Sequence, residues 1–327
     1  MVTLSSRARR RLKIAVSVLL VGGLVYFLDT DALVSSVTEL DFRYLLLALA
    51  MVFVNRVLMP LKWNLLLRAR GVYITNFEAV RVYTMSSFLG LVLPPTVGAD
   101  SVRSFYLKQS GIKLSDTVAS IVIERIFGLV VLLIFTLLGF AVLIHLLRGG
   151  ELDFQTFAIV LLILSTLMLT CVYFSFTPLF QRLVDSLATR SHGTRFAKLG
   201  TGLNSLVQAY QEYRQKKTVL ALFCGLTGLE LALVIVRSYV VALSLGVDLA
   251  IIHYLAFLPM VNLLNRMPIS FDGFGINEAL FIYFLALFGV SAEKGFLIGL
   301  INHLIFLIGI SPGAFFYIMS DRKQRDL

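Results

Sequence analysis

Two short polar stretches interrupt a chain that is otherwise largely apolar: LPPTVGADSVR at residues 93–103 and MPISFDGFGINE at residues 267–278. Both stretches place proline, glycine and charged residues between apolar runs of helical length. Backbone that breaks a helix within a membrane is tolerated only where protein buries it or where it lines a wet cavity. Paired interruptions in the two halves of such a chain therefore predict a transport site.

The composition places the chain in a lipid bilayer. The 327 residues are 58% hydrophobic, with a mean hydropathy of +0.88. The net charge of +10 does not indicate nucleic-acid binding, because the basic residues gather in short segments between apolar runs, as in cytoplasmic loops. Cys171 and Cys224 lie in apolar segments, so we expect packing roles and no disulfide framework. We expect no metal and no cofactor.

Six apolar segments are long enough to cross about 30 Å of hydrocarbon at 1.5 Å rise per residue. The segments are 12–28, 44–67, 118–147, 156–177, 218–245 and 296–319. The first follows a basic region and lacks a small-residue cleavage site, so we expect a retained helix and no removed signal peptide. Two shorter pairs flank the polar stretches, 80–93 with 101–110 and 251–267 with 276–290.

The loop charges orient these segments, since basic loops stay in the cytoplasm. Arginines and a lysine between residues 7 and 13 place the N-terminus inside, and the acidic 29–41 loop lies outside. Lys62, Arg68, Arg70 and Arg81 mark a return to the inside, and the most basic loop, 178–217, is cytoplasmic, as is the C-terminal tail. Residues 80–110 then begin and end inside, and residues 251–290 begin and end outside, which predicts two re-entrant hairpins that enter from opposite faces.

The predicted fold is an all-α polytopic membrane protein, with about six full spans and two opposed re-entrant hairpins, or about eight membrane segments. We expect one domain, 1–327, built from an inverted-topology repeat with halves near 12–147 and 156–319. When Gly111-Ile112 is aligned with Gly289-Val290, Glu124-Arg125 falls on Asn302-His303. Chance similarity between two apolar segments is the alternative explanation.

Charged residues within apolar segments are costly and usually face a cavity or a partner, so they are the candidate binding residues. The candidates are Arg56, Asp100, Arg103, Glu124, Arg125, Glu230, Arg237, Arg266, Asp272, Glu278 and His303. Glu230 and Arg237 are seven residues apart and share a helix face. Structural pairing with other helices, or with carbonyls freed at the helix breaks, is the competing interpretation of these charges.

The helix that follows each break begins with free N–H groups and the positive end of a helix dipole, which favour phosphate and other anions. Nearby arginines add bidentate phosphate recognition. The sequence therefore predicts an anionic or phosphate-bearing ligand. The acidic candidates would neutralise the arginines in the empty site, or bind protons or an amine.

A set of motifs resembles the lysylphosphatidylglycerol synthase/flippase membrane-domain family. In chain order the motifs are LPPxxGxDxxR from residue 93, GIxxxxxxAS from 111, ERIxG from 124 and PISxxGxGxxE from 268. The resemblance covers residues 10–320 and implies a flippase-like domain that moves a charged lipid between leaflets. It singles out Asp100, Arg103, Glu124, Arg125 and Glu278. Bifunctional members continue into an aminoacyl-transferase domain, so we expect this chain to lack lysyl-transfer activity.

The predicted function is translocation of an anionic lipid in a bacterial or archaeal cytoplasmic membrane. Candidates are a phospholipid, an aminoacylated phospholipid or a polyprenyl-phosphate-linked lipid. The alternatives are a scaffold or accessory subunit for a lipid- or glycan-modifying enzyme and, with less support, a membrane transferase. No HExxH, GxSxG or P-loop motif is present, so we expect no enzymatic activity. Membrane lipids are the predicted partners, and the oligomeric state is left open.

Overall fold

The computed structural model describes residues 6–92, 98–147, 205–266 and 270–325, with a few short pieces between 159 and 177. The described residues form helices and no strand. Four helical runs are long and apolar enough to cross a membrane: α3 (Phe42–Ala69), α6 (Leu114–Leu146), α10 (Lys217–Ser244), and α13 (Ala292–Ile310) continued by α14 (Pro312–Arg325). The predicted segment 156–177 and most of the basic loop lie outside the described residues, so the count of six spans stays a prediction.

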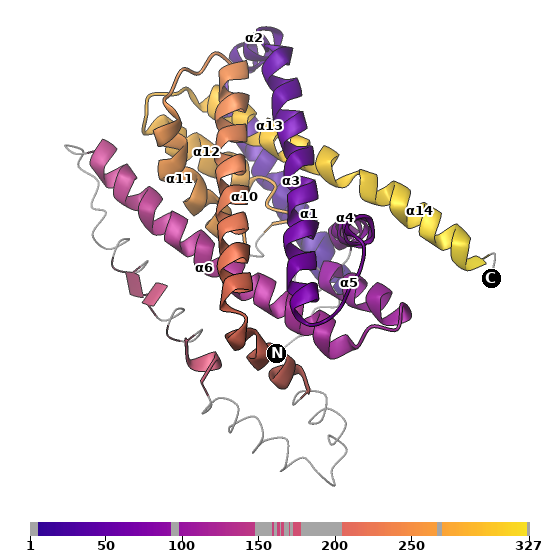
Figure 1. Ribbon diagram of the computed structural model, residues 1–327. Coiled ribbons are helices and arrows are strands. Elements are labelled where there is room, and N and C mark those ends of the chain that lie inside the picture. The colour runs from indigo at the N-terminus through magenta and orange to yellow at the C-terminus, as the bar shows by residue number, and fades with distance from the viewer. Residues whose placement is uncertain are drawn as a thin grey trace.

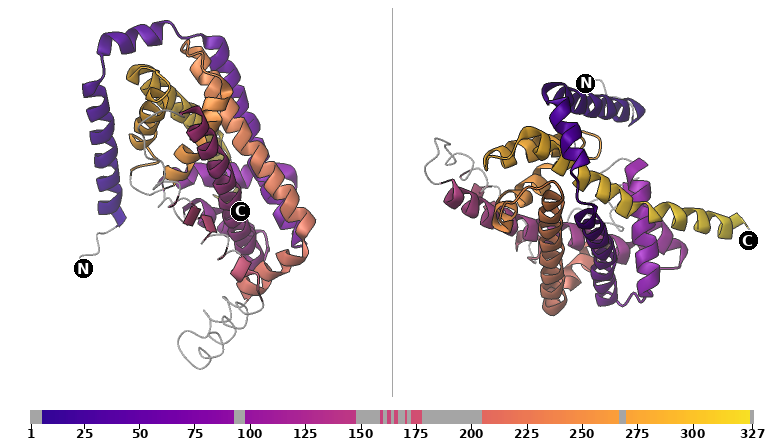
Figure 2. Two further views of the ribbon diagram at one scale, coloured as in Figure 1. Left: turned by 90° about the vertical axis from the view of Figure 1, so that its left-hand side faces the viewer. Right: turned by 90° about the horizontal axis from the view of Figure 1, so that it is seen from above.

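The N-terminal region adds one bent pair of helices, α1 (Ser6–Phe27) and α2 (Thr30–Thr38), which meet at 94° and count as a fifth span if taken together. The expectation of a loop over 29–41 was wrong, because Asp29 caps α2 by accepting hydrogen bonds from the backbone N–H groups of Asp31 and Ala32. Figure 2 shows α1 standing beside the main bundle.

Helices α3 and α10 pack antiparallel against each other along one side of the bundle (Figures 1 and 2). At one end, the backbone N–H of Asp41 donates to the carbonyl of Ser244 at 3.0 Å. At the other end, the Tyr213 hydroxyl donates to the carbonyl of Leu66 at 2.9 Å. These two contacts fix the direction and the register of the pair.

A pair of short helices lies at each polar stretch: α4 (Asn76–Val92) with α5 (Gly98–Gln109), and α11 (Ile251–Leu264) with α12 (Ile276–Ala286). The first pair starts and finishes beside the C-terminal end of α3. The second starts and finishes beside the C-terminal end of α10, near the N-terminus of α3. Pro94, Pro95 and Pro268 lie outside the described residues.

Each short pair packs against the long helices of both halves. Helix α5 contacts α6 while α4 contacts α14, and in the same way α12 contacts α13 while α11 contacts α6. Figure 1 shows that α6 and the α13–α14 run are inclined to α3 and α10. Glycines permit the closest approaches, since a Cβ on Gly139 would lie 2.5 Å from the carbonyl oxygen of Leu255, and one on Gly313 would lie 2.4 Å from that of Thr84.

The same helix-ending turn occurs four times among the residues that the structure describes. In each turn a glycine with positive φ follows the helix, and the residue after it donates its N–H to a carbonyl five residues earlier. The glycines are Gly71 (φ 73°), Gly111 (φ 80°), Gly246 (φ 66°) and Gly289 (φ 78°). The donor–acceptor pairs are Val72–Leu67, Ile112–Leu107, Val247–Ala242 and Val290–Leu285.

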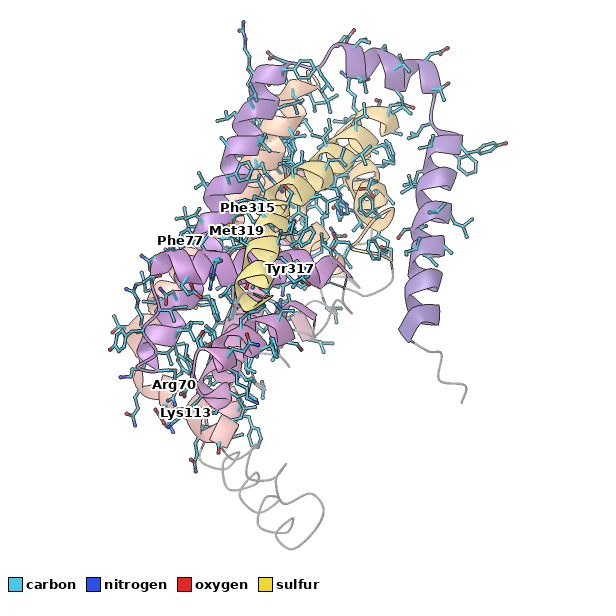
Figure 3. All side chains as sticks on the ribbon, turned by 90° about the vertical axis from the view of Figure 1, so that its right-hand side faces the viewer. Arg70, Phe77, Lys113, Phe315, Tyr317 and Met319 are labelled. Atoms are coloured by element: carbon cyan, nitrogen blue, oxygen red, sulfur yellow. The ribbon has the colours of Figure 1, made fainter. Side chains whose placement is uncertain are left out.

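The outer surface is apolar along the helices and charged at their ends. Figure 3 shows Arg70 and Lys113 at one end of the molecule, and Phe315, Tyr317 and Met319 along α14. Phe315 is 63% exposed and Met319 is 56% exposed. Large apolar side chains directed outward are expected where lipid is the solvent.

Candidate functional site

The first polar centre surrounds Arg103 of α5. Arg103 is 2% exposed. Its Nη1 donates to Glu124 Oε2 and its Nη2 donates to Asp100 Oδ1, each at 2.6 Å. The guanidinium also lies over the rings of Trp63 and Tyr83, with its Cζ 5.0 and 4.6 Å from the ring centroids. Two carboxylates and two aromatic faces therefore hold this charge.

Two further contacts complete the first polar centre. The Tyr83 hydroxyl donates to Glu124 Oε1 at 2.8 Å, and Arg125 donates to both carboxylate oxygens of Asp100, with Nη2 at 2.9 Å from Oδ1. Glu124 and Arg125 thus point to different partners, as adjacent residues on a helix must. With two arginines and two carboxylates the centre is neutral, and Arg125, 56% exposed, is its most accessible member.

The second polar centre lies at the start of α12. Glu278 is fully buried and its Oε2 accepts the backbone N–H of Gly275 at 2.6 Å. His303 of α13 lies between two carboxylates, with Nδ1 3.3 Å from Glu278 Oε1 and Nε2 3.5 Å from Asp272 Oδ2. Phe274 stacks on the imidazole at 3.8 Å. These contacts use both nitrogens of His303.

The backbone between the two carboxylates is left-handed at Asp272 (φ 51°), Gly273 (φ 83°) and Gly275 (φ 85°). Helix α1 packs on this turn, since the backbone N–H of Phe271 donates to Ser17 Oγ at 2.9 Å. A Cβ on Gly275 would lie 2.5 Å from the Cβ of Leu20. Both the left-handed backbone conformation and the close approach of α1 therefore require glycine at this position.

The third polar centre lies between α3 and α10, where Lys62 forms an ion pair with Glu230. The lysine also donates to Thr227 Oγ1 at 3.2 Å and is 4% exposed. The expectation that Lys62 is one of the loop charges at the end of a span was wrong, because its side chain is buried between α3 and α10. Lys62 lies within α3, and its charge is neutralised by α10.

Arg237 differs from Lys62 and Arg103 because it has no ion-pair partner among the described residues. It is 9% exposed, and its Nε has no hydrogen-bond partner. It lies on α10 seven residues after Glu230. The α10 face that carries both residues thus contains Glu230, neutralised by Lys62, and Arg237, which is unpaired.

Arg237 lines a cavity of about 250 Å³ whose walls are formed by α10, α11, the second polar stretch, α12 and α13. The lining also contains Arg266, Asp272, His303 and four asparagines, Asn262, Asn265, Asn277 and Asn302. Guanidinium and amide N–H groups donate hydrogen bonds and match the oxygens of a phosphate group. The cavity is therefore suited to an anionic headgroup.

The remaining candidate, Arg56, lies beside this cavity. Its Cζ is 4.4 Å from the centroid of Phe306, whose side chain lines the cavity, and Nη1 is 3.8 Å from Met59 Sδ. Arg56 forms no ion pair with a described residue. Of the eleven predicted residues, Arg237, Arg266, Asp272 and His303 thus share one cavity, while Asp100, Arg103, Glu124 and Arg125 form a separate centre.

Sequence reasoning missed the asparagines of the cavity as a group, and it missed Lys62 and Tyr83 as partners of Glu230 and Glu124. Asparagine within an apolar helix is a detectable signal, since it needs hydrogen-bond partners away from water. In the described part of the chain, no group of three or more histidine, cysteine or acidic side chains is arranged to hold a metal ion.

Comparison with known proteins supports the membrane assignment. The family model described as the lysylphosphatidylglycerol synthase TM region matches residues 12–312. No curated protein and no solved structure matches the chain. The match covers nearly all of the described helices and includes every polar centre described above. The chain therefore belongs to the lysylphosphatidylglycerol synthase transmembrane-region family.

Proposed function

We propose that this protein translocates an anionic, phosphate-bearing lipid between the leaflets of a bacterial or archaeal cytoplasmic membrane. The observation that carries the proposal is Arg237, a buried unpaired guanidinium on the wall of a cavity that also contains Arg266. A cation left unpaired within a membrane protein is costly unless a ligand supplies the counter-charge. The arrangement is suited to a headgroup and contains no recognisable catalytic motif, so we propose transport without covalent chemistry.

An inverted repeat would give such a protein two related conformations. The helix bounds support the presence of a repeat. Helices α3 and α4 start at positions 42 and 76, and α10 and α11 start at positions 217 and 251, so one constant offset relates both pairs. Helices α5 and α6 start at positions 98 and 114, and α12 and α13 start at positions 276 and 292, again with one constant offset. The second offset is slightly larger than the first, and the change falls at the polar stretch. The four glycine turns follow the same offsets, with Gly71 matched to Gly246 and Gly111 to Gly289.

The packing supports the inverted relation. Because α3 and α10 are antiparallel, the two short helix pairs start from opposite ends of the molecule, as expected of hairpins that enter from opposite membrane faces. The proposed cytoplasmic end carries Arg70 and Lys113, and α1 begins at that end (Figures 1 and 3). We propose that both termini are cytoplasmic.

The test is lipid exchange in proteoliposomes with fluorescent phosphatidylglycerol in the inner leaflet. We expect the wild type to accelerate exchange and Arg237→Gln to reduce the rate about ten-fold, because one charge-assisted contact is worth roughly 1.5–3 kcal/mol. Lys113→Gln, in the turn before α6, is the matched control and should exchange at the wild-type rate.

Two results would reject the proposal. One is wild-type protein, verified as folded, that accelerates exchange of no anionic phospholipid or polyprenyl phosphate. The other is Arg237→Gln that exchanges lipid as fast as Lys113→Gln. If cells in which a transport-inactive variant replaces the wild-type protein behave like wild-type cells, the scaffold alternative is favoured instead.

A further inference from the structure

The unpaired Arg237 has a counterpart elsewhere in the molecule. Counted from the first residue of each helix, Lys62 in α3 and Arg237 in α10 hold the same position. Asn55 in α3 and Glu230 in α10 also hold the same position. The buried cation of one half therefore corresponds to the buried cation of the other, and the acid that neutralises Lys62 corresponds to an asparagine.

The register of the two helices leads to the same pairing without reference to a repeat. Asn55 lies seven residues before Lys62, and Arg237 lies seven residues after Glu230. Seven residues are close to two helical turns, and α3 and α10 run antiparallel. Asn55 and Arg237 therefore lie two turns beyond the Lys62–Glu230 ion pair in the same direction along the α3–α10 interface.

The side chains at the two levels differ in their bonding. Lys62 bonds Glu230 and Thr227, so its charge is neutralised within the protein. Arg237 has a buried Nε without a partner, and Asn55 has a buried Oδ1 without a partner. Only Arg237 among these residues lines the cavity.

We infer that the α3–α10 interface contains two equivalent cation positions, one closed by the Glu230 carboxylate and one, at Arg237, completed by the phosphate ester of the ligand. Glu230 thus occupies in one half the place that the ligand's anionic oxygens occupy in the other. This inference deepens the proposed function, because it assigns the cavity to a phosphate group and identifies the residue that excludes such a group from Lys62.

If the two positions are equivalent, a carboxylate at position 55 should form an ion pair with Arg237, as Glu230 does with Lys62. Asn55→Glu should neutralise Arg237, with two opposite consequences. The purified protein in detergent should unfold at a higher temperature than Asn55→Gln, its control of the same size. Its affinity for micellar phosphatidylglycerol should fall at least ten-fold below that of Asn55→Gln. A misfolded variant cannot give both results.

The probes separate a lipid ligand from a soluble one. Binding is measured for phosphatidylglycerol, for diacylglycerol as the lipid without phosphate, and for glycerol 3-phosphate as the soluble ester. Binding of phosphatidylglycerol alone supports a lipid phosphate. Equal binding of diacylglycerol rejects the phosphate assignment, and binding of glycerol 3-phosphate in place of the lipid rejects the lipid as its source.

Removal of the internal acid tests the other half. Glu230→Gln should leave Lys62 without a counter-charge and raise the number of phosphatidylglycerol molecules bound per chain from one to two. Lys62→Gln combined with Glu230→Gln removes both charges and should restore one. If Glu230→Gln still binds one lipid, the two positions are not equivalent.

The inference and the proposed function can fail separately. If Asn55→Glu binds phosphatidylglycerol as tightly as Asn55→Gln, or unfolds no later, the inference is rejected even where wild-type protein accelerates lipid exchange. If the binding results hold and the wild type accelerates no exchange, the phosphate position stands and translocation is rejected.

Discussion

Among the described residues, α3 to α6 of the first half and α10 to α13 of the second follow the same order, but the arginines of the two halves have different partners. Arg103 in the first half has two carboxylates and two aromatic rings around it, whereas Arg237 in the second half has no ion-pair partner among the described residues. A charge that the protein neutralises itself stabilises a fixed arrangement of helices. A charge left unpaired on a cavity wall favours the binding of a ligand of opposite charge, because the ligand neutralises it.

The largest effect should come from breaking the first arrangement. Glu124→Gln removes the negative charge beside the buried Arg103 and replaces one of the two oxygens that accept from Arg103 and Tyr83 with an NH2 donor, so we expect a loss of about 3 kcal/mol of unfolding free energy. Arg237→Gln removes an uncompensated charge and should leave stability unchanged or raise it. Thermal and denaturant unfolding of the purified proteins measures both. Equal destabilisation by the two substitutions would remove the distinction between the halves.

The next prediction tests whether the close contact of α6 with α11 and that of α14 with α4 are equally sensitive to an added side chain. Gly139→Ala places a Cβ against the backbone of α11, and Gly313→Ala places one against the backbone of α4, so each should cost about 1–3 kcal/mol. Gly128→Ala, in α6 with open space around it, is the control and should stabilise by up to about 1 kcal/mol through helix propensity. Unfolding measurements that show only one of the two contacts to be sensitive would argue against equivalent packing.

The sequence predicted the long helices well because their signal is simple. A run of apolar residues in α3, α6 or α10 exceeds the thickness of a bilayer whatever its neighbours are. The charge of the loops predicts that the two pairs of short helices start at opposite membrane faces, and this orientation stays a prediction. Helix α2 was missed because Asp29 and Asp31 resemble loop residues, although the first of them is a helix cap.

The site was harder to predict because it depends on pairing. Eleven buried or broken-helix charges could be recognised from sequence, but sequence does not reveal which of them neutralise one another. Lys62 shows the difficulty, since a lysine near the end of an apolar segment has the same pattern whether it extends to water or bonds a distant acid such as Glu230. The unpaired state of Arg237 follows only after every other partner is assigned.

The last comparison, which includes the smallest expected effect, concerns two ion pairs that occupy matching positions. Asp100 holds the same position in α5 as Glu278 in α12, and Arg125 the same position in α6 as His303 in α13. Each half joins its two residues in an ion pair. The environments differ, because the Arg125 side chain is 56% exposed and that of His303 is 6% exposed. The comparison therefore isolates the effect of burial on one repeated contact.

We expect Arg125→Gln to change the unfolding free energy by less than about 1 kcal/mol, since an exposed pair gains little in a medium of high dielectric constant. His303→Gln should cost more, about 1–3 kcal/mol, because it weakens the bonding of the fully buried Glu278 carboxylate. Salt provides a second discriminating variable: about 0.5 M NaCl should reduce the contribution of Arg125 and leave that of His303 unchanged, because screening acts on exposed charges. A larger, salt-insensitive loss in Arg125→Gln would mean that lipid or protein covers this pair in the membrane, and the two halves would then be more alike than their exposures indicate.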